Sequence, residues 1–296
     1  GQFRLAAIDP AQLTFTHITD AAAVESPLAV DTSLTEVYWN SLNGQPLPAT
    51  LQEAREYADR LEERYGVTIL LSAQAQEACD AVWDATITTT DQWPLEDEPH
   101  AIARMLEALD RTLALYPDGF FRQMKNTMGE GGVRFMPVGH IENAVNAIGL
   151  TYETYGWQNI YIDVTIDAFD GTICHEIWHA IEGVLLTRNW DAINQEEWAA
   201  CNPAGFSYNE DAETPDSNPE RWTFFYEFSA QDVYFVDAYS RTNAKEDRAR
   251  IMEYIMATED VAGALVQSPA IAQKLQIMCR AIRENFDTSS WGEPRW

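Results

Sequence analysis

The sequence predicts an α+β fold in which a small mixed sheet is followed by a helical C-terminal part. Short β-branched runs alternate with amphipathic stretches before residue 165, whereas the later sequence favours helices and contains no internal repeat. Hydrophobic residues make up 46% of the 296 residues, enough for a buried core. We expect an N-terminal segment over residues 1–48 and one domain over residues 49–296, with a mixed α/β half (49–165) and a helical half (166–296).

The elements of the first half are predicted from their ends and their periodicity. Thr50 is a suitable N-cap, Glu53 stands at the capping-box position, and Gly66 follows the helical pattern as its C-terminal cap. A second amphipathic helix covers residues 98–116. Runs of β-branched residues predict four strands, with a loop-rich segment between the last two: VTILL (67–71), AVWDATITTT (81–90), GGVRFMPVG (131–139) and NIYIDVT (159–165).

The second half opens with a predicted helix over TICHEIWHAIEGVLL, residues 172–186. Residues 188–222 are rich in Asn, Asp, Glu and Pro and predict a long loop, and helices are expected from Arg221 onward. The acidic stretch NEDAETPDSNPE lacks the D-x-D-x-D-G spacing of a calcium loop, so we interpret it as solvated.

Charge excludes several classes of partner. The chain has 19 Lys and Arg against 47 Asp and Glu, a formal charge of −28 that disfavours nucleic acids and anionic membranes. No apolar run approaches the roughly 18 residues of a membrane-spanning helix. The cysteines show no C-x-x-C spacing, their pairing is not predicted, and Cys174 is expected to be a buried small hydrophobe. They are Cys79, Cys174, Cys201 and Cys279.

The segment His175-Glu176-Ile177-Trp178-His179 carries the strongest chemical signal. Two imidazoles at positions i and i+4 lie on one helical face, so both can bind the same metal ion. Glu176 follows the first histidine, where its carboxylate can act as a general base on water without binding the metal itself. The pattern predicts a zinc site on a helix.

The third ligand is less certain from spacing. Metzincins need Gly and His where Glu182 and Leu185 stand, which excludes that class. Glu196 and Glu197, about 20 residues after the second histidine, are one alternative. Glu246, in the first turn of a helix that Thr242 or Asn243 can cap, is the other.

A family resemblance favours the second alternative. The pattern Y-x-R-T-N-x-x-E, residues 239–246, after an H-E-x-x-H helix resembles the catalytic domain of anthrax lethal factor and its gluzincin relatives. The resemblance covers roughly residues 160–258 and implies a zincin-like fold with Zn²⁺ as the cofactor. It also implies the site residues: His175, His179 and Glu246 as zinc ligands, Glu176 as the base, and Tyr239 as a support of the transition state.

A second stretch has a similar implication. CNPAGFSYNE resembles the N-P-x-G-F-x-Y stretch of secreted bacterial zinc metallopeptidases, which implies a protein secreted by a bacterium or held at its surface. The lethal factor family often continues E-x-x-A-E, whereas Arg248, Ala249 and Arg250 follow Asp247 here. We assign the acid that supports a ligand histidine to Asp247, with Glu253 as the alternative.

The function we expect is zinc-dependent hydrolysis of internal peptide bonds, with water activated by Glu176. The partner is then a peptide or protein substrate, and the oligomeric state is not predicted. Two alternatives stay open: a zinc-containing cell-surface binding protein with little hydrolytic activity, and an enzyme that hydrolyses a non-peptide amide such as a cell-wall crosslink.

Overall fold

The computed structural model describes residues 46–143, 147–208 and 218–291. The chain divides into two units, Gly1–Val37 and Tyr38–Trp296, and every element described below lies in the second. Only residues 46–48 of the predicted N-terminal segment are among the described ones, so the boundary at residue 48 stays a prediction.

The sheet is small, mixed and open, which confirms the predicted α+β class. Its strand order is β1–β3–β5–β4, and β2 pairs with another part of β3. β3 is parallel to β1 and β5, whereas β2 and β4 are antiparallel to their partners. The strands are β1 (Thr68–Ile69), β2 (Thr86–Thr89), β3 (Gly132–Glu142), β4 (Gly149–Thr154) and β5 (Trp157–Asp163).

β4 corrects the sequence interpretation, which has a loop-rich segment between β3 and β5. The strand is joined to β5 by a two-residue turn at Tyr155 and Gly156, whose φ angles are 50° and 80°. Positive φ at both positions matches the twist that a two-residue hairpin requires. Only one of the six residues of β4 is buried, so it gives no alternating apolar signal, and the strand depends on hydrogen bonding to β5.

Alternate residues of the sheet enter two different cores. Phe135 and Ile160 face the main core, which the sheet shares with helices from both halves of the domain. Met136 and Tyr161 face a smaller cluster on the other side, where the Tyr161 hydroxyl donates a hydrogen bond to the Ala78 carbonyl at 2.6 Å. This period of two is the geometry of a strand, and here it covers both faces of the sheet.

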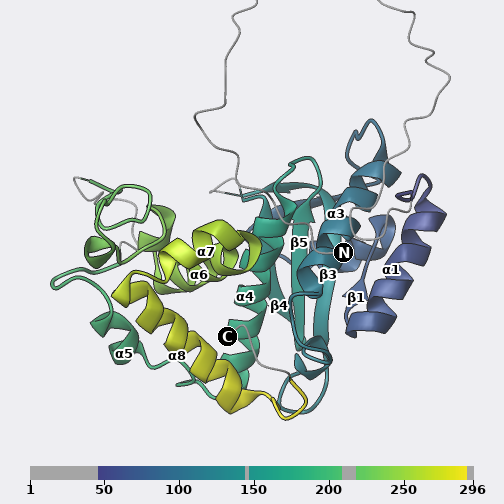
Figure 1. The fold of residues 1–296 in the computed structure, drawn as a ribbon. Helices are drawn as coiled ribbons and strands as arrows, with labels where there is room; N and C mark the ends of the chain where they lie inside the picture. The colour runs from purple at the N-terminus through teal and green to yellow at the C-terminus, as the bar shows by residue number, and fades with distance from the viewer. Residues whose placement is uncertain (1–45, 144–146, 209–217, 292–296) are drawn as a thin grey trace, which may run out of the picture. The chain divides into compact units, whose positions relative to one another are not determined.

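Eight α-helices occur in the described part of the chain. The first helix has the predicted ends, because Thr50 and Glu53 form a capping box and Gly66 adopts the left-handed conformation at φ 74°. α4 contacts β4 and β5 on one side and α6 on another, so it lies between the sheet and the C-terminal helices (Figure 1). The helices are α1 (Leu51–Tyr65), α2 (Gln76–Asp80), α3 (Glu98–Leu113), α4 (Phe169–Arg188), α5 (Gln195–Ala200), α6 (Ala244–Ala257), α7 (Glu259–Leu265) and α8 (Pro269–Asn285).

One prediction for the second half is wrong, and a second holds from residue 244 onward. The predicted loop over residues 188–222 contains α5, which Asn194 caps by accepting a hydrogen bond from the Glu197 amide at 2.9 Å. The part from Arg221 onward is helix-rich as predicted, with α6, α7 and α8, but its first α-helix begins at residue 244 and the segment before it forms short 3₁₀ turns and a bridge. Beside that bridge, which pairs Thr223 with Phe235, the Phe224 amide donates to the Phe235 carbonyl at 2.9 Å.

Two buried ion pairs join α6 to its neighbours. Arg248 on α6 donates two hydrogen bonds to Glu182 on α4, at 2.8 and 2.6 Å, and the two side chains are 2% and 6% exposed. Asp247 lies 2.7 Å from Lys274 on α8, and neither side chain is exposed. Tyr208 donates a further hydrogen bond to Asp247 at 2.6 Å. The first turn of α6 is therefore fixed from both sides.

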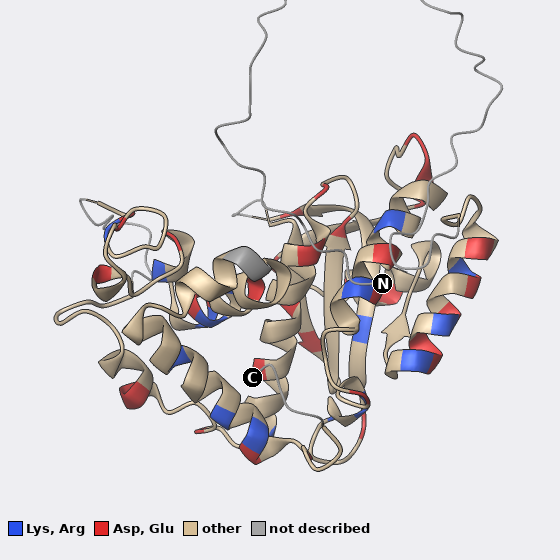
Figure 2. Cartoon of the chain, in the orientation of Figure 1, with Lys and Arg blue, Asp and Glu red and all other residues tan. Residues whose placement is uncertain are grey.

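No helix in the described ranges is both long and apolar enough to span a membrane. Figure 2 shows basic residues interspersed with acidic ones on α1, which carries three Arg. α8 carries three Lys or Arg, of which Lys274 is buried, and a single Glu. Surface charge on these helices is therefore of mixed sign despite the formal charge of −28.

Candidate metal centre

α4 carries the two histidines, and burial on almost every side fixes the position of this helix. Ile177, Trp178 and Ile181 are fully buried in the main core. His175 and Glu176 are also buried, and His179 is partly buried. A helix packed on most of its faces keeps its polar residues at fixed positions. The two imidazole rings are consequently presented together, with centroids 4.9 Å apart.

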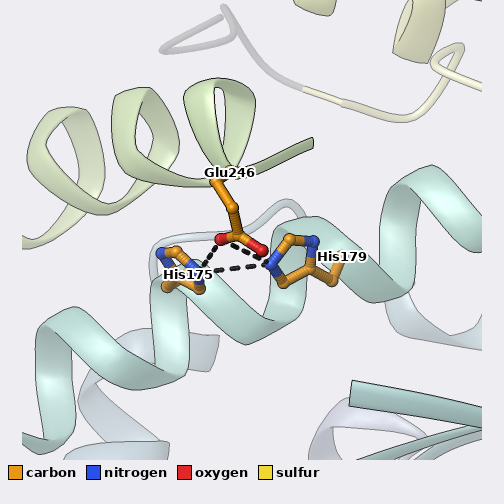
Figure 3. Close-up of side chains that lie close together, drawn as sticks. All are labelled: His175, His179 and Glu246. Atoms are coloured by element: carbon orange, nitrogen blue, oxygen red, sulfur yellow. Dashed lines mark hydrogen bonds and ion pairs between the residues drawn. The ribbon is translucent and has the colours of Figure 1, made fainter. Parts of the chain in front are cut away.

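Glu246 reaches the histidines from the first turn of α6. Asn243 caps this helix by accepting hydrogen bonds from the amides of Lys245 and Glu246 at 2.9 and 3.0 Å. Of the two predicted caps, Thr242 and Asn243, the structure therefore uses Asn243. The cap fixes where α6 begins, and the Glu246 carboxylate then points toward the imidazoles (Figure 3).

The three donor atoms have the spacing of ligands around one ion. Glu246 Oε2 lies 3.0 Å from His175 Nε2 and 3.4 Å from His179 Nε2, and the two nitrogens are 3.2 Å apart (Figure 3). A tetrahedron with metal–ligand bonds of about 2.05 Å has edges of about 3.3 Å. In the described ranges this is the one group of three or more potential ligand side chains close enough to hold a metal ion. Two imidazoles and a carboxylate are a donor set that fits zinc.

In the absence of a bound cation, a proton balances the charge of this group. Burial lowers the pKa of His175, but its hydrogen bonds with Glu246 and Glu253 outweigh burial and raise the pKa to about 10. Burial raises the pKa of Glu246, yet its hydrogen bonds with the two histidines hold that pKa well below its usual range. At neutral pH the group is then a carboxylate paired with a protonated His175.

We expect zinc binding at neutral pH to release about one proton, because an imidazolium must lose its proton before it can bind a metal. The pKa of His175 is raised above its ordinary value, so protonation favours the metal-free state at neutral pH and this preference disappears as the pH rises through about 10. Apparent zinc affinity should therefore increase about tenfold per pH unit across neutral pH. Calorimetric titration in buffers of different ionisation enthalpy measures the released protons, and a binding enthalpy independent of the buffer would contradict the expectation.

Glu176 is oriented by the neighbouring strand. Thr151 on β4 donates a hydrogen bond to Glu176 Oε2 at 2.8 Å. Gly149 on the same strand lies so close to α4 that a Cβ there would stand 2.8 Å from Glu176 Cγ and 2.6 Å from Thr172 Cγ2. A glycine at this position lets β4 approach the helix and hold the carboxylate. Neither β4 residue was predicted as functional, since the strand itself was missed.

Tyr239 lies beside the three donor atoms. It begins a 3₁₀ turn, Tyr239–Arg241, and its ring centroid is 6.2 Å from that of His175. Partial burial, followed by the negative charges of Glu246 and Glu176, raises the pKa of its hydroxyl above the usual range. The hydroxyl therefore stays protonated at neutral pH and is available as a hydrogen-bond donor.

Glu253, rather than Asp247, supports a histidine. Glu253 Oε2 accepts a hydrogen bond from His175 Nδ1 at 3.2 Å, which leaves Nε2 directed toward the other donors. Asp247 points away into its pair with Lys274. Helical geometry explains the correction, because Glu253 is seven residues after Glu246 and lies on the same face of α6, whereas the adjacent Asp247 does not.

The other sequence alternatives are not part of this group. Glu197, on α5, pairs with Arg280, whose Nη1 donates to its Oε1 at 3.0 Å, and Glu196 is exposed on the same helix. Most of the acidic stretch considered for calcium, residues 209–217, lies outside the described ranges. All four cysteines are buried with free thiols, as predicted for Cys174.

Two of the pockets that adjoin the group include His175, Glu176 and Tyr239. The Phe169 pocket, lined also by the first turn of α4 (Phe169–Thr172), has a volume of about 590 Å³. The Leu186 pocket, lined also by β4 residues and by His179 and Leu186 farther along α4, has a volume of about 380 Å³. Both volumes are in the range of ligand sites. The two pockets share Glu176 and Tyr239, the candidate catalytic residues.

No family model matches the sequence, and neither a curated protein nor a solved structure shows significant similarity to it. The resemblance to gluzincins therefore depends on the quoted motifs alone.

Proposed function

We propose that this protein is a metal-dependent endopeptidase of the gluzincin type, with a zincin-like fold and zinc as its cofactor. The observation that carries the proposal is the set of three donor atoms, 3.0–3.4 Å apart, with Glu176 next to the first histidine. When bound, the metal supplies Lewis acidity, which makes water nucleophilic at neutral pH and polarises a carbonyl group. His175, His179 and Glu246 would hold it.

The remaining roles belong to side chains around the metal centre. Glu176 takes a proton from the attacking water and returns it to the leaving amine, while Thr151 keeps its carboxylate in one orientation. Tyr239 donates its hydroxyl hydrogen bond to the oxygen that becomes negative in the transition state.

A substrate chain that continues on both sides of the cleaved bond suits the two pockets, which meet at Glu176 and Tyr239. β4 has one strand partner among the described residues, β5, and its other edge can add an extended peptide as an antiparallel strand. These features favour cleavage inside a chain. Secretion by a bacterium or attachment to its surface is proposed from the motif resemblance only.

The proposal is tested by metal analysis and by hydrolysis of a peptide library, with and without a chelator. We expect about one zinc per chain, internal cleavages identified by mass spectrometry, and recovery of activity when zinc is restored. Zinc without cleavage of any peptide, protein or cell-wall amide would favour a zinc-containing binding protein. Failure to bind metal even after zinc is added would overturn the proposal.

Replacing Tyr239 by Phe should lower kcat with little change in KM, because the hydroxyl is proposed to bond only the developing oxyanion. We expect a loss of about 10- to 100-fold, less than the 10²–10³-fold typical of a fully enclosed oxyanion donor, since Tyr239 is 43% exposed. Steady-state kinetics with one defined peptide measures both constants. An unchanged kcat would remove Tyr239 from the mechanism.

A further inference from the structure

Arg250 on α6 joins two carboxylates from different parts of the chain. Its Nε donates to Asp237 Oδ2 at 2.9 Å, its Nη2 donates to the same oxygen, and its Nη1 donates to Glu253 Oε2. All three side chains are less than one-fifth exposed. Nη2 also donates to the Tyr254 hydroxyl at 3.3 Å. A planar guanidinium can hold two carboxylates at once, and we call Asp237, Arg250 and Glu253 the Arg250 cluster.

One arm of the Arg250 cluster reaches the metal centre. The Glu253 oxygen that binds Arg250 is also the one that accepts from His175 Nδ1. Gly171 on α4 lies close to this carboxylate, because a Cβ there would stand 3.1 Å from Glu253 Oε1, and both residues line the Phe169 pocket together with Arg250. The Glu253 carboxylate therefore binds His175 and Arg250 at the same time, so Arg250 helps to fix the orientation of His175.

The other arm reaches the turn that carries Tyr239. Asp237 Oδ1 accepts hydrogen bonds from the Ser240 amide at 3.0 Å and from the Ser240 hydroxyl at 3.1 Å. Ser240 is fully buried. Its two hydrogen bonds to Asp237 Oδ1 close the turn from residue 237 to residue 240, while Arg250 binds Asp237 Oδ2. Tyr239 lies inside this turn.

We propose that Arg250 is a positioning residue that sets His175 through Glu253 and Tyr239 through Asp237. The proposal rests on the proposed function, because it assumes a bound metal and a catalytic Tyr239. The two arms should then have separate effects: the Glu253 arm acts on metal affinity and the Asp237 arm acts on turnover. An ion pair that contributed only to stability would not separate these two quantities.

Lysine is not equivalent to arginine in this cluster. Its single ammonium group can lie between two carboxylates but lacks the fixed fork that directs separate N–H groups to each of them. Arg250→Lys therefore keeps the charge and should loosen both arms. Asp237→Asn is more selective, since its amide oxygen can still accept from Ser240 while its NH₂ group cannot accept from Arg250.

The experiment compares Arg250→Lys, Asp237→Asn and Glu253→Ala with the unmodified protein. Zinc dissociation constants come from competition with a chromophoric chelator, kcat and KM from one peptide substrate, and folding from the melting temperature of the metal-free forms. Arg55→Lys on α1 is the matched control, because Arg55 also bridges two carboxylates, Asp59 and Glu62, and none of the three lines the Phe169 or Leu186 pocket.

We expect Glu253→Ala and Arg250→Lys to weaken zinc binding about 10- to 100-fold, as for other hydrogen-bond partners of ligand histidines. Asp237→Asn should keep the zinc affinity and lower kcat by about tenfold or more, because a small misplacement of a catalytic group is costly. In the Tyr239→Phe background Asp237→Asn should then change kcat by less than about twofold, since both changes act through one hydroxyl.

Several results would overturn the assignment. If Arg250→Lys behaved like Arg55→Lys while the unmodified protein bound zinc, the inference would fail and the proposed function would stand. The inference would also fail if Asp237→Asn weakened zinc binding as much as Glu253→Ala, or if its effect on kcat were undiminished without the Tyr239 hydroxyl. Should Arg250→Lys not fold, the two single-arm variants decide. An unmodified protein that bound no zinc would end both proposals.

Discussion

Replacing Glu176 by Gln should abolish peptide hydrolysis while leaving about one zinc per chain. The amide has the shape of the carboxylate, and its oxygen can still accept the Thr151 hydrogen bond, but it cannot take a proton from water. General base catalysis typically contributes 10²–10⁴-fold, so we expect kcat to fall by about 10³-fold or more in a centre where no other base is proposed.

The measurement pairs metal content with turnover on the same protein sample. Glu196→Gln, which changes an exposed acid on α5, is the control and should keep both. Hydrolysis that survived Glu176→Gln, with zinc still present, would show that another group activates the water. Loss of zinc together with activity would instead mean that Glu176 belongs to the ligand set.

Replacing Glu246 by Ala should remove zinc almost completely, because two histidines alone leave half of a tetrahedral site to water. Loss of a group that only supports a ligand already costs 10–100-fold in affinity, so loss of the ligand itself should cost more than about 100-fold. The pKa of His175 should fall as well, since Glu246 is the foremost of the partners that raise it.

Metal content after gel filtration and chelator competition measure this change. Glu196→Ala and Glu197→Ala are matched controls from the alternative position of the third ligand, and both should retain zinc. Retention of zinc by Glu246→Ala, with loss in Glu197→Ala, would contradict the geometry of the three donor atoms and return the third ligand to α5.

The features that the sequence predicts correctly depend on local interactions. The capping box at Thr50 and the left-handed Gly66 are set by residues within one or two turns, and so is the Asn243 cap that places Glu246 in the first turn of α6. The spacing of His175 and His179 is likewise a property of one helix. Such contacts can be inferred from a short window of sequence.

The features that the sequence does not reveal depend on contacts between distant segments. β4 is a strand because β5 pairs with it, and the Thr151 contact with Glu176 exists only once that pairing brings the strand to α4. Spacing alone also left both Glu246 and the Glu196–Glu197 pair as possible third ligands, since a linear sequence does not show which helix faces α4.

Asp247 is a different case, because the sequence contained the signal that excludes it. Glu246 and Glu253 are seven residues apart and share a helical face, whereas Asp247 is rotated by about 100° from Glu246. Applying the helical period to the predicted α6 would have selected Glu253. What it could not show is that Lys274 and Tyr208 bury the Asp247 carboxylate.

The ion pair between Glu182 and Arg248 bears on how the protein would acquire the proposed zinc ion. It joins the helix of the histidines to the helix of Glu246 through two hydrogen bonds that involve no metal ion. Removing one partner of a buried ion pair typically costs about 3–5 kcal/mol. The ligands are therefore preorganised, and metal uptake need not be coupled to folding as it is in a zinc finger. Zinc would then bind reversibly to a chain that is already folded. The free energy of unfolding would increase with the logarithm of the free zinc concentration.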